Sequence, residues 1–257
     1  MFYFDDVNIK ELEKLLINYD KCFKKENKDC LRDFYKIKKL LKKVKNTLKY
    51  YTLSMYSDIL TNLLNQKFYN TFLNDNLKIK RKEEKETLNN LIKYIKEHNI
   101  NSLMFIDFSN FKYINDNYGY DKGDKILEIF GDFLNSYPII GVRRGGDEFI
   151  ILGNKNVINN ISSIIHSNAF LKTLNNVIDH NNDTIITFPI YGIAIFDNKK
   201  ITASNFKEKI SKTVKIAEEN YKINKERKKR SLIYKYIKDD SLRKKIYSYR
   251  TNLNISY

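Results

Sequence analysis

Apolar residues recur along this chain at spacings typical of helices in some segments and of strands in others. In residues 8–25 they lie on one helical face, formed by Leu12, Leu15, Leu16, Tyr19 and Phe23. From Cys30 onward the spacing alternates three and four, through Phe34, Ile37, Leu41, Val44, Leu48, Tyr51 and Met55. This repeat favours a parallel coiled coil over residues 30–57 that pairs two chains; the alternative is a helix packed on helix 8–25 of the same chain.

Beyond residue 57 the pattern predicts a mixed domain and a tail. Helices are expected at 66–97, 110–117, 122–136, 157–178 and 203–224, and strands at 102–107, 139–144, 148–152, 184–195 and 231–236. That order indicates an α+β domain over residues 58–236, with helices against one mostly antiparallel sheet. Residues 1–57 form a helical N-terminal region, and the tail 237–257 is expected to hold a short helix with a frayed end.

Glycine and proline are confined to the second half of the chain. All eight glycines lie between Gly119 and Gly192, and the only prolines are Pro138 and Pro189. The first 118 residues therefore favour long helices. No apolar run approaches the ~18 residues needed to span a membrane, so no membrane span and a cytoplasmic location are expected. The two cysteines form no CxxC pair of the kind that binds metal or exchanges disulfides.

The net charge is +16, with 47 basic and 31 acidic residues, but it is unevenly distributed. Residues 101–153 hold five basic and eight acidic side chains, whereas 207–245 hold fifteen basic and six acidic ones. An acidic centre beside a basic segment suits a nucleoside triphosphate with its metal as well as it suits DNA. Because no nucleic-acid module is recognised, a nucleic-acid partner is not expected.

Two glycines and two carboxylates stand together in residues 143–149, Arg-Arg-Gly-Gly-Asp-Glu-Phe, directly before an apolar run. Glycines tolerate positive φ and let a backbone turn approach a ligand closely, which nominates Gly145 and Gly146 for substrate binding. Carboxylate oxygens are ligands that Mg²⁺ prefers. The pattern therefore predicts a turn that binds a nucleotide and a metal.

Two further motifs make this prediction specific. Residues 103–127 read LMFIDFSNFKYINDNYGYDKGDKIL, and residues 58–65 read DILTNLLN. Together with the glycine turn they resemble the GGDEF family of diguanylate cyclases, whose patterns are roughly D-x-L-T-G-L-x-N, D-I-D-x-F-K-x-I-N-D-x-x-G-H-x-x-G-D and Gly-Gly-Asp-Glu-Phe. The resemblance covers residues 58 to about 236 and implies the ferredoxin-like palm shared with nucleotidyl cyclases. It further implies Mg²⁺ or Mn²⁺ as cofactor, GTP as substrate, cyclic di-GMP as product and a homodimer.

Asp107 ends a predicted strand and Asp147 lies in the turn, so adjacent strands can bring both carboxylates to one edge of the sheet. Two carboxylates at one edge suit phosphoryl chemistry assisted by metal ions. By resemblance Asp107, Asp147 and the carbonyl of Phe108 are metal ligands, whereas an isolated Asp107 is equally explained as a helix cap. Glu148 is the candidate that deprotonates or orients the attacking 3′-hydroxyl.

Other candidate residues follow from the resemblance alone. Lys112 matches the lysine that contacts phosphate, and Asn115 and Asp124 match the residues that bind guanine. A carboxylate accepts from guanine N1–H and N2–H₂, which adenine does not offer. In the weaker C-terminal match, the pattern A-D-x-A-L-Y-x-A-K-x-x-G-R-N aligns with the run from Ala217 to Lys229, so Lys225 and Lys229 are expected to hold phosphates; the alternative is a solvated, lysine-rich helix end.

The chain departs from the family patterns at several positions. Ser109 replaces the second Asp of D-I-D, Tyr120 replaces His, Asn62 replaces Gly, and Lys229 replaces the arginine of the C-terminal pattern, which puts bidentate recognition in doubt. The resulting prediction is a diguanylate cyclase in which two subunits join two GTP molecules into cyclic di-GMP and two pyrophosphates. The alternative is an inactive domain that binds GTP or cyclic di-GMP and regulates a partner.

Overall fold

The structure is a computed structural model that describes residues 55–178 and 185–251. Apart from Met55, these residues belong to one compact unit, Tyr56–Tyr257. The helix predicted at 8–25 lies outside the described residues, and so does the coiled coil at 30–57 except for its last three positions. These three form a turn and a β-bridge from Ser57 to Leu64, so the predicted helix does not extend over them.

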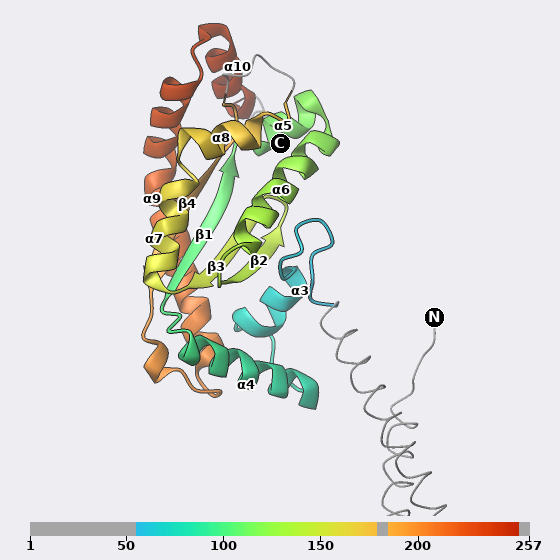
Figure 1. Ribbon diagram of the computed structural model, residues 1–257, viewed down its shortest axis with the longest axis vertical. Coiled ribbons are helices and arrows are strands. Elements are labelled where there is room, and N and C mark those ends of the chain that lie inside the picture. Colours follow the sequence, from blue (N-terminus) through green and yellow to red (C-terminus); the bar gives the residue numbers. More distant parts are fainter. Residues whose placement is uncertain (1–54, 179–184, 252–257) are drawn as a thin grey trace, which may run out of the picture. The chain divides into compact units, whose positions relative to one another are not determined.

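Four strands form one antiparallel sheet in the middle of this unit (Figure 1). They are β1 (Ser102–Ser109), β2 (Ile140–Gly145), β3 (Glu148–Gly153) and β4 (Phe188–Ile195), in the order β2-β3-β1-β4. Each neighbouring pair is antiparallel. The predicted α+β class with a mostly antiparallel sheet is thus confirmed.

Helices cover both faces of the sheet. They are α3 (Gln66–Phe68), the π-helix η1 (Tyr69–Leu73), α4 (Lys82–Glu97), α5 (Phe111–Tyr118), α6 (Tyr120–Asn135), α7 (Lys155–Ile164), α8 (Asn168–Asn175), the short 3₁₀ helix η2 (Asn198–Lys200), α9 (Phe206–Tyr236) and α10 (Asp240–Thr251). Helices α6, α7 and α8 lie over one face, and α9 lies behind the other (Figure 1).

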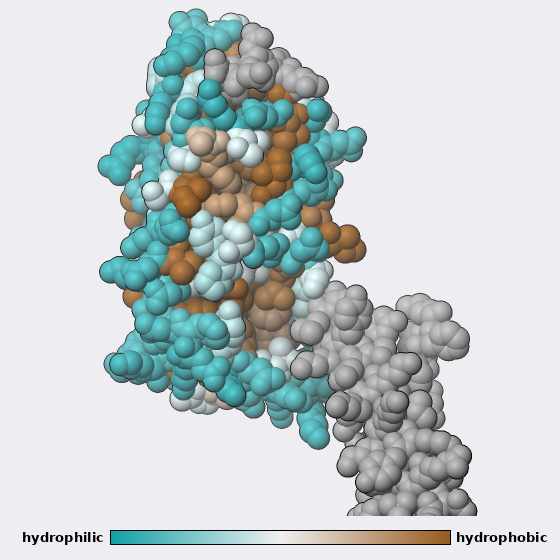
Figure 2. Space-filling model, in the orientation of Figure 1, coloured by the Kyte–Doolittle hydropathy of each residue, from teal (hydrophilic) through white to brown (hydrophobic). Residues whose placement is uncertain are grey.

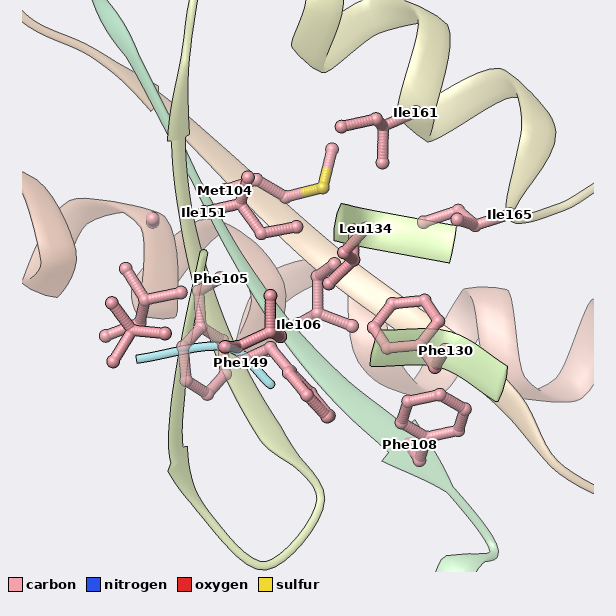
Figure 3. Packing of buried hydrophobic residues seen from close by; sticks show 14 of the residues in the cluster. Met104, Phe105, Ile106, Phe108, Phe130, Leu134, Phe149, Ile151, Ile161 and Ile165 are labelled. Atoms are coloured by element: carbon pink, nitrogen blue, oxygen red, sulfur yellow. The ribbon is translucent and has the colours of Figure 1, made fainter. Parts of the chain in front are cut away.

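Alternation along β1 sends its side chains to these two faces in turn. On one face Phe108 packs edge-on against Phe130 of α6, with ring centroids 4.9 Å apart (Figure 3). On the other, Phe105 packs against Tyr221 of α9 at 5.2 Å. Asp107 follows Phe105 by two residues, so it points toward α9 as well. The apolar core thereby aims the candidate metal ligand at a helix remote in sequence.

Two predicted helices are interrupted. The segment 66–97 breaks at an Asx turn, where the Asn74 side chain accepts from the backbone N–H two residues on at 3.0 Å, and α4 begins only at Lys82. The segment 157–178 divides into α7 and α8, because the Ser167 hydroxyl accepts from the Phe170 N–H at 3.2 Å and caps a new helix.

The strand predicted at 184–195 begins later, as β4 at Phe188. Just before it, the backbone N–H groups of Ile186 and Thr187 donate to the Asn175 side-chain oxygen at 2.9 and 3.0 Å. These donors are therefore bound to a side chain of α8 rather than to a neighbouring strand.

The strand predicted at 231–236 is wrong, because α9 runs unbroken from Phe206 to Tyr236. The family pattern has a helix-ending glycine where this chain has Lys228, and lysine is a good helix former. Ile233 and Tyr236, three residues apart, are buried on one helical face with exposures of 0% and 8%. Packing of that face favours the helix over a strand.

The helix expected in the tail is present as α10, and it packs on α5. Ile246 is 2% exposed, the ring of Tyr249 lies 5.3 Å from that of Tyr113, and the Tyr249 hydroxyl donates to Asp116. Helix α10 thus supports the helix that carries two candidate substrate residues, Lys112 and Asn115.

No helix within the described residues is long and apolar enough to cross a membrane. On the face shown in Figure 2, hydrophilic residues cover most of the surface and hydrophobic patches lie among them.

Candidate active site

The acidic residues of the candidate site converge at one end of the sheet. The register of β1 and β3 places Asp107 directly opposite Glu148, and Asp147 immediately precedes Glu148 in the β2–β3 turn. Gly146 adopts φ 49°, a conformation that glycine takes without strain, and its carbonyl accepts from Arg143 Nε at 2.8 Å. The sequence correctly predicted that adjacent strands bring these carboxylates together.

The first motif braces the strand that leads into this turn. Arg143 forms an ion pair with Asp58 at 3.2 Å, and the hydroxyl of Thr61 donates to the same carboxylate at 2.7 Å. The Arg143 N–H donates to the Leu64 carbonyl at 2.7 Å. Asn62 stands where the family has glycine and takes φ 56°, a conformation that asparagine tolerates better than most residues. This departure therefore preserves the local backbone.

A small cavity of about 310 Å³ adjoins the glycine turn. Its lining consists of the turn, the Asp58–Arg143 pair and the start of α3, namely Asp58, Asn65, Gln66, Lys67, Arg143, Gly145 and Gly146. Both predicted substrate-binding glycines thus face open space rather than packed side chains.

Burial and mutual repulsion perturb the turn carboxylates. Burial, followed by the charge of Asp107, raises the pKa of Asp147 from 3.8 to about 7, with a smaller contribution from Glu148 and an opposing one from Lys225. Burial also raises the pKa of Glu148, although Arg144 opposes that shift. Two carboxylates that repel each other in a partly dehydrated site favour a bound cation.

Helix α9 contributes two donors to Asp107. The Tyr221 hydroxyl and Lys225 Nζ both donate to Oδ2 of Asp107, the latter at 3.1 Å. The side chains of Asp107 and Lys225 are 15% and 21% exposed, so this ion pair is largely shielded from solvent. From the sequence we predicted that Lys225 binds a phosphate. In the structure its ammonium group instead donates to the carboxylate of Asp107.

Lys229 lies one turn beyond Lys225 on α9, and it is only 6% exposed. From the sequence we expected the Lys229 side chain to be accessible to phosphate, whereas the structure buries most of it. The continuation of α9 past Lys228 explains the difference, because Lys229 stays on the packed helix instead of entering a turn.

The candidate guanine-binding residues lie at the junction of α5 and α6. The side-chain oxygen of Asn115 is buried and has no hydrogen-bond partner within the described part of the chain. Gly123 of α6 lies so close that a Cβ there would fall 2.0 Å from that oxygen. Asp124, the next residue, is exposed, as is Lys112 on α5. A buried acceptor without a partner costs about 1–3 kcal/mol.

The two departures from the second motif differ in their surroundings. Ser109 ends β1 at 1% exposure, and its hydroxyl finds no partner among residues 55–178 and 185–251. Tyr120 is 71% exposed at the start of α6. Neither contributes a side-chain hydrogen bond to the acidic end of the sheet in the described structure.

Sequence reasoning missed Arg144. Its guanidinium lies 3.4 Å from Glu148 and bonds to Glu218 of α9, with its centre 5.2 Å from the Tyr69 ring and 5.6 Å from the Phe105 ring. It thus links the glycine turn to α9 and η1. The only feature of the sequence that could have indicated Arg144 is its position directly before Gly145.

Sequence reasoning also missed Tyr221. The family pattern has leucine at this position in the C-terminal match, so the replacement of leucine by tyrosine was the one feature of the sequence that could have indicated it.

Among the described residues, no group of three or more His, Cys, Asp or Glu side chains is arranged to hold a metal. Within the described residues, the predicted metal-binding side chains that come together are those of Asp107 and Asp147.

Comparisons with known proteins agree with the motifs. "Diguanylate cyclase DgcS" of Shewanella oneidensis is 30% identical over 133 residues, which cover 50% of this chain and 40% of the relative. "Diguanylate cyclase DgcP" of Escherichia coli is 42% identical over 66 residues, or 24% of this chain and 19% of the relative. The chain therefore matches less than half the length of these curated relatives.

Among solved structures, the coiled coil and GGDEF domain of DgcB from Caulobacter crescentus, in complex with c-di-GMP, aligns with 76% of this chain and 93% of its own. The TM-score is 0.48 and the sequence identity 15%. The profile described as "Diguanylate cyclase, GGDEF domain" matches residues 55–231, well over half of the chain. With its three motifs gathered around one acidic end of the sheet, this chain belongs to the GGDEF family.

Proposed function

We propose that this protein is a diguanylate cyclase, which condenses two GTP molecules into cyclic di-GMP and releases two pyrophosphates. The observation that carries the proposal is the convergence of Asp107, Asp147 and Glu148 beside a glycine turn. In each of two steps, a 3′-hydroxyl oxygen attacks the α-phosphorus of the other GTP. A new P–O bond forms, the bond to the β-phosphate breaks, pyrophosphate leaves, and the hydroxyl proton passes to a base.

The residues present fit Mg²⁺ or Mn²⁺ brought in with the nucleotide. Mg²⁺ in phosphate sites is commonly held by one or two carboxylates, with substrate phosphates and water completing the shell. Asp107 and Asp147 supply two carboxylates, and the Phe108 carbonyl is the proposed third protein ligand. Burial and, after it, the charge of Asp107 raise the pKa of Asp147, and a bound cation would offset both effects. When bound, the cation polarises the phosphoryl oxygens and neutralises their developing charge.

The chain's own groups position the reactants. Glu148 is the proposed base or orienting group for the 3′-hydroxyl, and burial raises its pKa, which makes its carboxylate a stronger base. Lys112, Lys225 and Lys229 are the proposed phosphate contacts. For Lys225 this requires its ammonium group to leave Asp107 as the nucleotide and its cation arrive, and for Lys229 it requires a change from its buried position.

Asn115 and Asp124 are the proposed guanine contacts. The unpartnered Asn115 oxygen supports this role, since a guanine N–H would satisfy it once the side chain turns this oxygen out from beside Gly123. Because one subunit holds one GTP, two subunits are needed to close the product ring, and we propose a homodimer formed through residues 30–57. We also propose a cytoplasmic location, where GTP is available.

The test is incubation of the pure protein with GTP and Mg²⁺, followed by chromatographic separation of the products. Cyclic di-GMP and pyrophosphate in a 1:2 ratio are expected, with ATP as the matched control that gives no product. Asp107→Asn and Asp147→Asn should each abolish product while an unchanged circular dichroism spectrum shows that the fold is intact. Full turnover by either variant would remove the metal assignment.

The second candidate function is that of a regulatory module that binds GTP or cyclic di-GMP without turnover. The contact that favours it is the one between Lys225 and Asp107, which occupies a carboxylate that catalysis needs. Saturable nucleotide binding with no product, at protein concentrations that give a dimer, would support this module over the cyclase.

A further inference from the structure

We propose that Tyr221 is a positioning residue for Asp107, holding its carboxylate in the orientation that receives the cation. The inference rests on the proposed metal role of Asp107, and it concerns a side chain that the family pattern does not supply. The pattern has leucine at this position, which cannot donate a hydrogen bond.

The contact is made inside the packed face between α9 and the sheet. Tyr221 is 5% exposed, and its hydroxyl donates to Oδ2 of Asp107. Its ring meets the ring of Phe105 edge-on, with centroids 5.2 Å apart and an interplanar angle of 68°. Phe105 and Asp107 are two residues apart on β1 and share one face of the sheet. The strand that presents the carboxylate therefore also holds the tyrosine ring.

The backbone of Tyr221 is held as closely as its ring. Gly192 of β4 lies against α9, and a Cβ at that position would fall 2.3 Å from the Tyr221 nitrogen. Such an approach leaves no clearance for the helix to shift toward the strand. The hydroxyl is thus presented to Asp107 from a fixed position.

A fixed donor matters because a carboxylate turns easily. The terminal torsion of an aspartate has broad, roughly two-fold preferences, so a hydrogen bond to one oxygen selects the plane of the group. Both donors from α9 bond to Oδ2, which leaves Oδ1 out of these two contacts. The ammonium group of Lys225 is charged, so substrate phosphates attract it away from Asp107. The Tyr221 hydroxyl carries no charge and remains bound to Asp107. After Lys225 moves, Tyr221 still satisfies Oδ2 and orients Oδ1.

The experiment compares two tyrosines of the same helix. Tyr221→Phe removes the hydroxyl and keeps the ring. Tyr236→Phe is the matched control, because Tyr236 is 8% exposed on α9 and its hydroxyl has no partner within the described residues. The probe is Mn²⁺ with 3′-deoxy-GTP, which lacks the attacking hydroxyl and cannot react. Bound Mn²⁺ is measured by electron paramagnetic resonance, with Asp107→Asn as the variant that loses binding.

Loss of a group that orients a metal ligand typically costs about 10–100-fold in metal affinity. We therefore expect Mn²⁺ affinity to fall about 10-fold in Tyr221→Phe and to stay at the wild-type value in Tyr236→Phe. In turnover with GTP, the Mg²⁺ concentration for half-maximal rate should rise in Tyr221→Phe, while the rate at saturating Mg²⁺ changes much less. Thermal denaturation should show both variants folded.

Several results would overturn the proposal. One is equal Mn²⁺ affinity of Tyr221→Phe and wild type while Asp107→Asn loses binding. Another is an equal loss in both tyrosine variants, which would show a general effect of removing a buried hydroxyl. Absence of Mn²⁺ binding by the wild type would also refute it, since Asp107 would then hold no cation. If the wild type binds Mn²⁺ yet makes no cyclic di-GMP, the proposed cyclase function fails while the comparison of the tyrosines still decides the role of Tyr221.

Discussion

Substitution of one glycine tests whether the packing of α9 on β4 sets the geometry of the site. A Cβ built on Gly192 would lie 2.1 Å from the Ala217 carbonyl oxygen, 2.3 Å from the Tyr221 nitrogen and 2.9 Å from its Cα. All three are backbone atoms, so no side-chain rotation relieves the overlap. Ordinary contact begins at 3.4 Å, and α9 would therefore have to retreat by about 1.3 Å, the difference between 3.4 and 2.1 Å.

The expected effect of Gly192→Ala has two parts. Overpacking of a well-filled contact costs about 1–3 kcal/mol, and the reduced freedom of the unfolded chain returns about 0.4–1 kcal/mol, so a net loss of about 1–2 kcal/mol is expected. The same shift moves Tyr221 and Lys225 away from Asp107. Misplacement of catalytic groups by about 1 Å can reduce rates by about 100-fold.

Urea unfolding measures the loss of stability, and the rate of cyclic di-GMP formation measures the effect of moving Tyr221 and Lys225 away from Asp107. Gly153→Ala is the matched control, because its nearest neighbours are the side-chain ends of Ile158 and Ile139, at 3.2 and 3.3 Å, which can yield. It lies at the far end of β3 from the turn and should keep near-normal stability and rate. If Gly192→Ala unfolds and turns over GTP like the wild type, the packing of α9 does not set the site.

Three further substitutions test other contacts. Gly123→Ala should lower GTP affinity without loss of stability, because its Cβ would displace the Asn115 oxygen, 2.0 Å away; unchanged affinity in calorimetric titration would exclude Asn115 as a base contact. The pKa of Asp147 is raised to about 7, so its ionised form opposes folding. The free energy of unfolding of the metal-free protein should fall as pH rises from about 4 to about 7, and Asp147→Asn should flatten that fall in urea titrations; an equal slope in both proteins would contradict the shift. Ile246→Ala removes a side chain that is 2% exposed, and it should cost about 2–5 kcal/mol and speed hydrogen exchange in α10 and α5; unchanged exchange would show that α10 does not support α5.

Local chemistry accounts for the part of the site that the sequence predicted. The hairpin predicted at 139–144 and 148–152 is observed at 140–145 and 148–153, because the two glycines specify the turn and apolar runs specify the strands beside it. Once that hairpin pairs with β1, the register brings Asp107 opposite Glu148. Neighbouring residues therefore determine the turn and place a carboxylate on each strand, and the long-range pairing of β1 with β3 brings the carboxylates together.

The errors lie where local preferences are nearly balanced. Residues 231–236, Ser-Leu-Ile-Tyr-Lys-Tyr, suit a strand as well as a helix, and burial of Ile233 and Tyr236 on α9 decided the outcome. The helix predicted at 157–178 ends first at Ile164, and the Ser167 hydroxyl caps the start of a second helix. Both results depend on contacts that a periodic pattern does not contain.

The sequence by itself determined the β2–β3 hairpin, its glycine turn and the candidate carboxylates beside the strands, since these depend on residues that are adjacent in the chain or paired through one hairpin. Only the tertiary structure decided which side chains complete the site. Tyr221 and Lys225 reach Asp107 across separations of 114 and 118 residues, and no spacing in the sequence encodes that approach. The approach follows from the close contact of α9 with Gly192, because the absence of a side chain there lets the helix lie near enough to place both donors on one carboxylate oxygen.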